Sequence, residues 1–138
     1  STDGTVVDTF NIYVSYSIGD TYTVTIPANF PVEWGYEDGT KVSYTANTEM
    51  NAASSISVKV SSDGTGEMVS VIDPNLKLDY TTANFDVETT FNGMVTNGTQ
   101  DPAPEVTVSG WDDVPVGEYK TILTYTVVYD NGSDDGTT

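Results

Sequence analysis

Carboxylates are the side chains of this sequence that could do chemistry, and Glu33 and Glu37 form its most suggestive pair. They flank Trp34 and Tyr36 in the sequence. In glycoside hydrolases, two carboxylates similarly flank a sugar, which can stack on an aromatic side chain. In an extended chain, four residues separate the two glutamate backbones by about 13 Å, whereas hydrolysis needs carboxyl groups roughly 5–10 Å apart. We therefore expect a solvated edge here and no catalytic pair.

Few other catalytic groups are available. The chain has 138 residues with no cysteine and no histidine, and its four basic residues are all lysines. The lack of cysteine excludes disulfides, thiolate zinc sites and a cysteine nucleophile. The lack of histidine removes the commonest general base and metal ligand. We therefore expect a protein that is not an enzyme, with no catalytic residue and no cofactor to name.

Aromatic side chains could instead bind a ligand. Trp34, Tyr36 and Trp111, with Tyr44 and Tyr119, could form a platform on which sugar rings stack. That would make the chain a carbohydrate-binding module or adhesin domain with glycans as partners. The alternative, which we favour, is that the two tryptophans fill the core near the ends of a sandwich, because large rings close gaps between sheets efficiently.

Acidic clusters are the candidate metal sites. The segment 130–136 offers oxygens at alternate positions, as calcium loops do, with Asp130 and Asp134 as candidate ligands. The glutamate that such a loop needs later in the sequence is missing. Asp112 and Asp113 could add carboxylates from another loop. Weak Ca²⁺ binding is one interpretation, and a solvated acidic surface is the favoured one.

Two glycosylation motifs of the Asn-x-Ser/Thr type lie in polar stretches. They begin at Asn97 and at Asn131. Both asparagines are acceptor candidates if the source organism glycosylates its surface proteins.

The net charge of −17 limits the possible partners. Such a chain repels phosphate backbones, so we expect no nucleic-acid partner, and anionic membrane surfaces are disfavoured for the same reason. No run of eighteen apolar residues could insert into a membrane. The first residues do not resemble a signal peptide, so we expect that an export signal has been removed and that the protein is extracellular, at the cell surface.

Short alternating runs of valine, threonine, tyrosine and isoleucine, separated by glycine, proline, asparagine and aspartate, predict an all-β fold. About eight to ten strands with turn signals every 8–12 residues favour a single antiparallel β-sandwich, immunoglobulin-like or jelly-roll. A closed barrel is the alternative. We expect an N-terminal extension over residues 1–9, the sandwich over residues 10–129, and an acidic flexible tail over residues 130–138.

Four local predictions follow from the pattern. Residues 10–26 read as a hairpin around Gly19-Asp20, and Asn92-Gly93 as a second, two-residue hairpin turn. The stretch 46–55 is the only one that could form a helical turn, with a loop as the alternative. The last strand, residues 119–129, has bulky residues on both faces, which predicts a central position.

Three sequence phrases resemble those of a known group. They are Tyr22-Thr-Val-Thr-Ile-Pro27, the middle strands leading to Asp73-Pro74-Asn75, and the run from Gly110-Trp111 to Leu123-Thr-Tyr-Thr-Val127. Together they resemble small secreted β-sandwich proteins of Firmicutes, including fibre- or pilin-like structural subunits. The resemblance implies an extracellular structural module and brings no catalytic residues. Trp111 followed by two aspartates, and the acidic tail, depart from that pattern.

The beginning of the chain suggests how such a module could assemble. Residues 10–18 alternate strictly between apolar and more polar side chains, so one face could fill the groove of a neighbouring copy. Pairing within the same copy is the alternative, and residues 5–8 or the last strand could be exchanged instead. We therefore predict a structural subunit that forms a filament, pilus or layer with identical copies by strand addition. Its donor-strand candidates are Val6, Val7, Phe10, Ile12, Val14, Tyr16 and Ile18.

Overall fold

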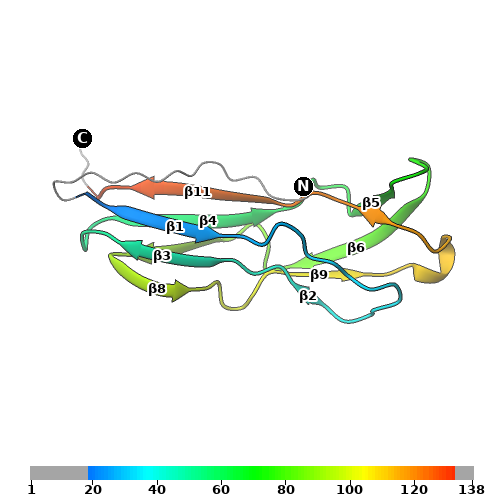
Figure 1. Cartoon of the computed structure of the whole chain (residues 1–138), viewed down its shortest axis with the longest axis horizontal. Helices are drawn as coiled ribbons and strands as arrows, with labels where there is room; N and C mark the ends of the chain where they lie inside the picture. Colours follow the sequence, from blue (N-terminus) through cyan, green and yellow to red (C-terminus); the bar gives the residue numbers. More distant parts are fainter. Residues whose placement is uncertain (1–18, 133–138) are drawn as a thin grey trace.

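The computed structural model describes residues 19–132, which form an elongated all-β molecule (Figure 1). The donor-strand candidates between Val6 and Ile18, and the candidate ligand Asp134, lie outside the described residues. The described part contains eleven strands and one short 3-10 helix, η1 (Trp111–Asp113). The predicted antiparallel β-sandwich is confirmed.

The strands form three antiparallel sheets. Two three-stranded sheets make up the left half of the molecule in Figure 1, and a five-stranded sheet makes up the right half. The first sheet has the order β1 (Thr21–Thr25), β3 (Thr45–Glu49), β8 (Met94–Gly98), and the second has the order β11 (Thr124–Asp130), β4 (Ser55–Ser61), β7 (Glu88–Asn92). The third has the order β10 (Tyr119–Lys120), β5 (Glu67–Ser70), β6 (Lys77–Ala83), β9 (Glu105–Val108), β2 (Thr40–Lys41).

The five-stranded sheet connects the other two. Its edge strand β2 leads along the chain into β3 of the first sheet, and its opposite edge strand β10 leads into β11 of the second. The buried Tyr125 hydroxyl of β11 donates a hydrogen bond to the carbonyl of Val42, between β2 and β3, at 2.7 Å. This hydrogen bond links the connection between β2 and β3 to β11 across the core.

Period-two alternation builds the core, as the sequence predicts. Ile56, Val58 and Val60 of β4 are completely buried, while the residues between them are partly exposed. In β6, Leu78 and Tyr80 are buried in the same way. Because successive side chains of a strand point to opposite faces, each strand delivers one apolar row to the interior.

The expectation of a helical turn or loop at 46–55 is wrong for its first half. Residues 45–49 form β3, which pairs with both β1 and β8. Ala46 and Thr48 continue the buried row begun by Tyr44, and the Thr48 hydroxyl donates to the Gly93 carbonyl at 2.7 Å. Small and polar residues thus form a strand here because β1 and β8 pair with its backbone and Gly93 accepts the Thr48 hydrogen bond.

The expected hairpin at Asn92-Gly93 is also wrong. β7 pairs with β4 and β8 pairs with β3, so the chain passes from one sheet to the other at Gly93. The Gly93 N–H donates to the Ser54 carbonyl, and its carbonyl accepts the Met50 N–H, both at 3.1 Å. These bonds to the 50–54 loop replace the bonds of a hairpin turn.

The long last strand is interrupted and does not lie centrally. It divides into β10 and β11, and β11 pairs only with β4 among the described strands. The inner face carries Leu123 and Tyr125, both buried, whereas Ile122 and Val128 on the other face are mostly exposed. Bulk on both faces therefore did not indicate burial on both faces. In β5, likewise, Met68 and Ser70 face inward while Val69 is exposed.

Within residues 19–132, no helix has the length and apolar character needed to cross a bilayer.

Candidate functional site

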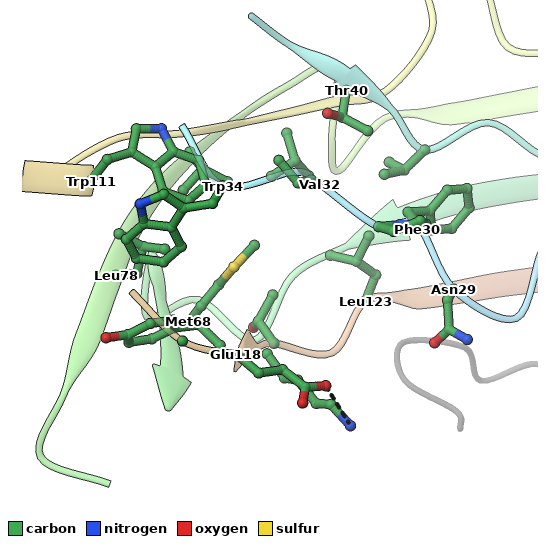
Figure 2. Close-up of a pocket in the computed structure, with 18 residues that line it drawn as sticks. Asn29, Phe30, Val32, Trp34, Thr40, Met68, Leu78, Trp111, Glu118 and Leu123 are labelled. Carbon is green, nitrogen blue, oxygen red and sulfur yellow. Dashed lines mark ion pairs between the residues drawn. The ribbon is translucent and has the colours of Figure 1, made fainter. Parts of the chain in front are cut away.

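A groove of about 620 Å³ lies in the five-stranded half of the described residues (Figure 2). Its volume lies within the roughly 300–1,000 Å³ range of ligand sites. We call it the aromatic groove and define it by two rims and a floor. One rim is formed by residues 29–32 and 34, the other by residues 117–121 and 123, and the remaining lining residues are Thr40, Val42, Met68, Leu78, Val106, Val108 and Trp111.

The floor of the groove is apolar because three neighbouring strands present their inner faces to it. Leu78 of β6 and Val106 and Val108 of β9 are 2–4% exposed, and Met68 of β5 packs against them partly buried. β6 pairs with β9 in a continuous register from Tyr80 to Ala83. The floor is therefore part of a rigid sheet.

The first rim crosses the floor without forming a strand. Phe30, Val32 and Trp34 alternate in the sequence and pack half-buried against the core, but residues 26–39 belong to no strand. Pro31 lacks an N–H for a sheet ladder. Phe30 stacks on Tyr125, with ring centroids 6.3 Å apart. This rim is held by side-chain packing.

The second rim carries an open strand edge. On one side, β10 pairs with β5, and the Glu118 carbonyl accepts the Val71 N–H at 3.0 Å. On its other side, β10 has no strand partner among residues 19–132. Lys120 and Glu118 form an exposed ion pair at 3.9 Å (Figure 2), which contributes little to stability.

Aromatic rings close one end of the groove. Trp34 and Trp111 meet edge to face with centroids 4.7 Å apart, and Tyr119 lies 5.8 Å from Trp34. The Trp111 Nε1 atom is buried and has no hydrogen-bond partner among residues 19–132. Tyr36 does not line the groove and is 44% exposed, and Tyr44 is buried in the core. The structure thus brings together the two tryptophans and Tyr119 of the proposed platform.

Several groove residues were not singled out as site residues in the sequence, chiefly Phe30, Met68 and Leu123. For Phe30 and Leu123 the signal was present as the alternation of residues 30–34 and 119–123, whereas Met68 lies in neither segment. That alternation shows which side chains face inward, but it does not show that the two segments stand opposite each other.

Beyond the groove, strands β1 and β11 contact each other through their side chains, and we call this contact the seam. Tyr22 of β1 and Tyr129 of β11 stack with centroids 5.7 Å apart. The Tyr129 hydroxyl also donates to the Asp20 carboxylate, which accepts bonds from the Asn51 N–H at 2.8 Å and the Ser54 hydroxyl at 2.5 Å. At this end of the molecule, side chains thus close the seam between β1 and β11. At the other end, the groove lies between the two rims.

These bonds change the ionisation of both groups. Burial by itself would raise the pKa of Asp20, but the hydrogen bonds from Ser54, Tyr129 and Asn51 outweigh it and hold the pKa below its ordinary value. Burial, followed by the bond to Asp20, raises the pKa of Tyr129. The pair is therefore most stable with a charged carboxylate and a neutral phenol.

The candidate metal ligands are not brought together. Asp112 and Asp113 lie in η1 on the right of Figure 1, whereas Asp130 ends β11 on the left. Among residues 19–132, no group of three or more carboxylates is arranged to hold a metal ion. Glu33 and Glu37 are both exposed.

Both glycosylation candidates are exposed. Asn97 lies in β8 with a φ of +53°, and its N–H donates to the Asn47 side chain at 2.8 Å. Asn131 follows β11 directly, and its carbonyl lies 3.4 Å from the Ser54 hydroxyl.

No protein-family model matches the chain, and no curated protein shows significant similarity to it. We therefore infer its function from the groove, the seam and the sequence.

Proposed function

We propose that the protein is an extracellular structural subunit that joins identical copies into a filament, pilus or layer by β-strand addition. The observation that carries this proposal is the open edge of β10 beside an apolar floor. An added strand would bond to that edge through its backbone and pack alternate side chains against the partly buried apolar residues above the floor. The same feature distinguishes the groove from an ordinary ligand pocket, which has no need of an unpaired strand.

The exposed edge supports the proposal on a second ground. Natural sheets usually protect their edges, because an unpaired strand edge next to apolar surface promotes association. Here two protecting devices are present, since β10 is only two residues long and Lys120 places a charge on it. Phe30, Trp34 and Met68, which are apolar and only partly buried, nevertheless line the groove. A subunit that assembles needs such an edge, whereas a protein that acts alone has to cover it.

Charge is compatible with this function. A net charge of −17 keeps separate copies soluble through mutual repulsion. The groove itself contains one acidic and one basic side chain, Glu118 and Lys120, which pair with each other. Contact at the groove therefore brings little unbalanced charge together, and the repulsion between the remaining surfaces weakens as salt increases.

Negative-stain electron microscopy of the full chain tests the proposal. We expect filaments or ordered layers at high protein concentration, more readily at high than at low ionic strength. A parallel sample with a chelator shows whether divalent cations contribute. Single particles under all of these conditions, with a monomeric mass in sedimentation, would contradict the proposal.

Carbohydrate binding is the second candidate function, and the contact between Trp34 and Trp111 favours it. Two tryptophans at one end of a groove, near the polar side chains of Asn29 and Glu118, provide stacking surface and hydrogen-bonding groups. Titration with oligosaccharides while tryptophan fluorescence is recorded tests it. A saturable change that Trp34→Ala abolishes, with the circular dichroism spectrum retained, would support this function.

A further inference from the structure

We propose that residues 10–18 of a second copy of this chain occupy the aromatic groove. This inference rests on the proposed function and names the segment, its source and its place. The sequence left three candidates for the exchanged segment, which were residues 10–18, residues 5–8 and the last strand, and this inference selects residues 10–18. The apolar face of that segment would pack against the partly buried side chains of Phe30, Trp34 and Met68. That face carries Phe10, Ile12, Val14, Tyr16 and Ile18.

The dimensions of the segment and the groove agree. The rim between residues 117 and 123 spans seven positions, which in an extended chain cover about 23 Å. Residues 10–18 span about 30 Å when extended, with side chains of one face about 6.7 Å apart. Three or four of the five apolar side chains therefore fit along the groove, and the rest extend beyond it toward β11.

The tether at Asp20 distinguishes insertion from the same copy from insertion by another copy. Asp20 is bound to Asn51, Ser54 and Tyr129, at the end of the seam far from the groove. The six residue steps from Tyr129 in β11 to Leu123, just before that strand, cover about 20 Å, the same distance that a fully extended chain covers from Asp20 back to Val14. In its own copy Val14 would reach the near end of the groove, so Phe10, Ile12 and Val14 could enter but Tyr16 and Ile18 could not. A second copy has no such tether, so it could insert Tyr16 and Ile18 as well.

The charge distribution fits this occupant as well. Residues 10–18 contain no charged side chain, although the chain as a whole carries 21 acidic residues and four lysines. Inserting them into the groove therefore desolvates no charge of the donor. The open edge of β10 supplies backbone partners, and the period-two alternation fixes which face enters.

Cysteine cross-linking on the full chain tests the inference, because the native sequence contains no cysteine. The donor variants are Ile12→Cys, Val14→Cys and Tyr16→Cys, each mixed with a differently tagged acceptor variant. The acceptor is Val32→Cys, on the first rim, and its matched control is Val69→Cys, exposed on the opposite face of β5. After assembly and mild oxidation, we expect on the order of tenfold more disulfide-linked heterodimer with Val32→Cys than with Val69→Cys, because binding raises the effective thiol concentration.

The alternatives give different results. Filaments that form normally without any preferred heterodimer would overturn this inference and leave the proposed function standing. A disulfide formed within one chain carrying both Val14→Cys and Val32→Cys, diluted with excess native protein, would place the segment in its own copy and overturn it too. Saturable binding of an oligosaccharide to the groove of assembled protein would mean that no strand fills it. The absence of any polymer would overturn the inference and the proposed function together.

Discussion

Tyr22 and Tyr129 stack across the edges of two different sheets, with ring planes 16° apart. Tyr22 belongs to β1 and Tyr129 to β11, and the hydroxyl of Tyr129 reaches the Asp20 carboxylate just before β1. Side chains thus close the seam at the point where no backbone pairing links the two strands in the described part of the chain.

The Tyr129 hydroxyl and the Tyr129 ring make separable contributions to stability. Tyr129→Phe removes the bond to Asp20 and keeps the stack, so we expect a loss of about 1 kcal/mol in the free energy of unfolding. Tyr129→Ala also removes the ring contact and adds a loss of roughly 0.5–1.5 kcal/mol. Urea denaturation measures both. Val128→Ala, at an exposed neighbouring residue, is the control and should change little; equal losses for Phe and Ala would contradict the separation.

Asp20 should contribute to acid sensitivity. Its folded pKa lies below its ordinary value, so the folded state prefers the charged form. The resulting stability is fully present above the unfolded pKa of about 3.9 and is lost as the pH falls through the lower folded pKa. Asp20→Asn should therefore lower the melting temperature near neutral pH and reduce this part of its fall toward pH 3. Asp112→Asn, at an exposed residue of η1, is the control. Parallel curves for native protein and Asp20→Asn at all pH values would exclude this role.

The ring of Trp111 should matter more than its indole nitrogen. Because the Nε1–H is buried without a partner among the described residues, Trp111→Phe removes an unsatisfied donor and should leave the free energy of unfolding within about 1 kcal/mol of the native value. Trp111→Ala removes the contact with Trp34 and should cost about 2 kcal/mol, less than for a fully buried tryptophan. Thermal and urea unfolding give the comparison. A phenylalanine variant as unstable as the alanine variant would show that the nitrogen has a partner.

Charge on the apolar face of residues 10–18 should prevent assembly. Val14→Asp places a carboxylate where the proposed interface is apolar, whereas Ser15→Asp places it on the other face. At about 1.5–3 kcal/mol for a large buried apolar side chain, loss of Val14 alone weakens association about tenfold or more. Sedimentation and electron microscopy should show monomers for Val14→Asp and filaments for Ser15→Asp. Equal assembly by the two variants would be incompatible with insertion of that face.

Gly98 should tolerate no larger residue. A Cβ at this position would lie 2.6 Å from Val95 Cγ1 and 2.8 Å from the Phe91 ring, so Gly98→Ala forces the β8 end to shift. We expect a loss of roughly 1–3 kcal/mol in the free energy of unfolding from this overpacking. Gly117→Ala, whose Cβ would make an ordinary 3.8 Å contact with Tyr119, is the control and should unfold like the native protein.

Much of the fold could be predicted from the sequence because a strand with one buried face records that face in its own residues. The alternation of Ile56, Val58 and Val60 predicts β4, and that of Tyr22 and Val24 predicts β1. The all-β class, the absence of histidine and cysteine chemistry, and the acidic surface are likewise properties of the residues themselves.

Pairing between distant strands was decided only by the tertiary structure. Asn92-Gly93 has the local chemistry of a hairpin, yet the bonds of Gly93 to Met50 and Ser54 send the chain into the other sheet. Ala46 and Thr48 lack strong strand preference, yet β1 and β8 hold them in a strand. The groove arises in the same way, because Trp34 meets Trp111 only when segments about 80 residues apart pack together. A residue's own pattern shows which side it buries, whereas its neighbours across a sheet or a groove depend on contacts between segments that are far apart in the chain.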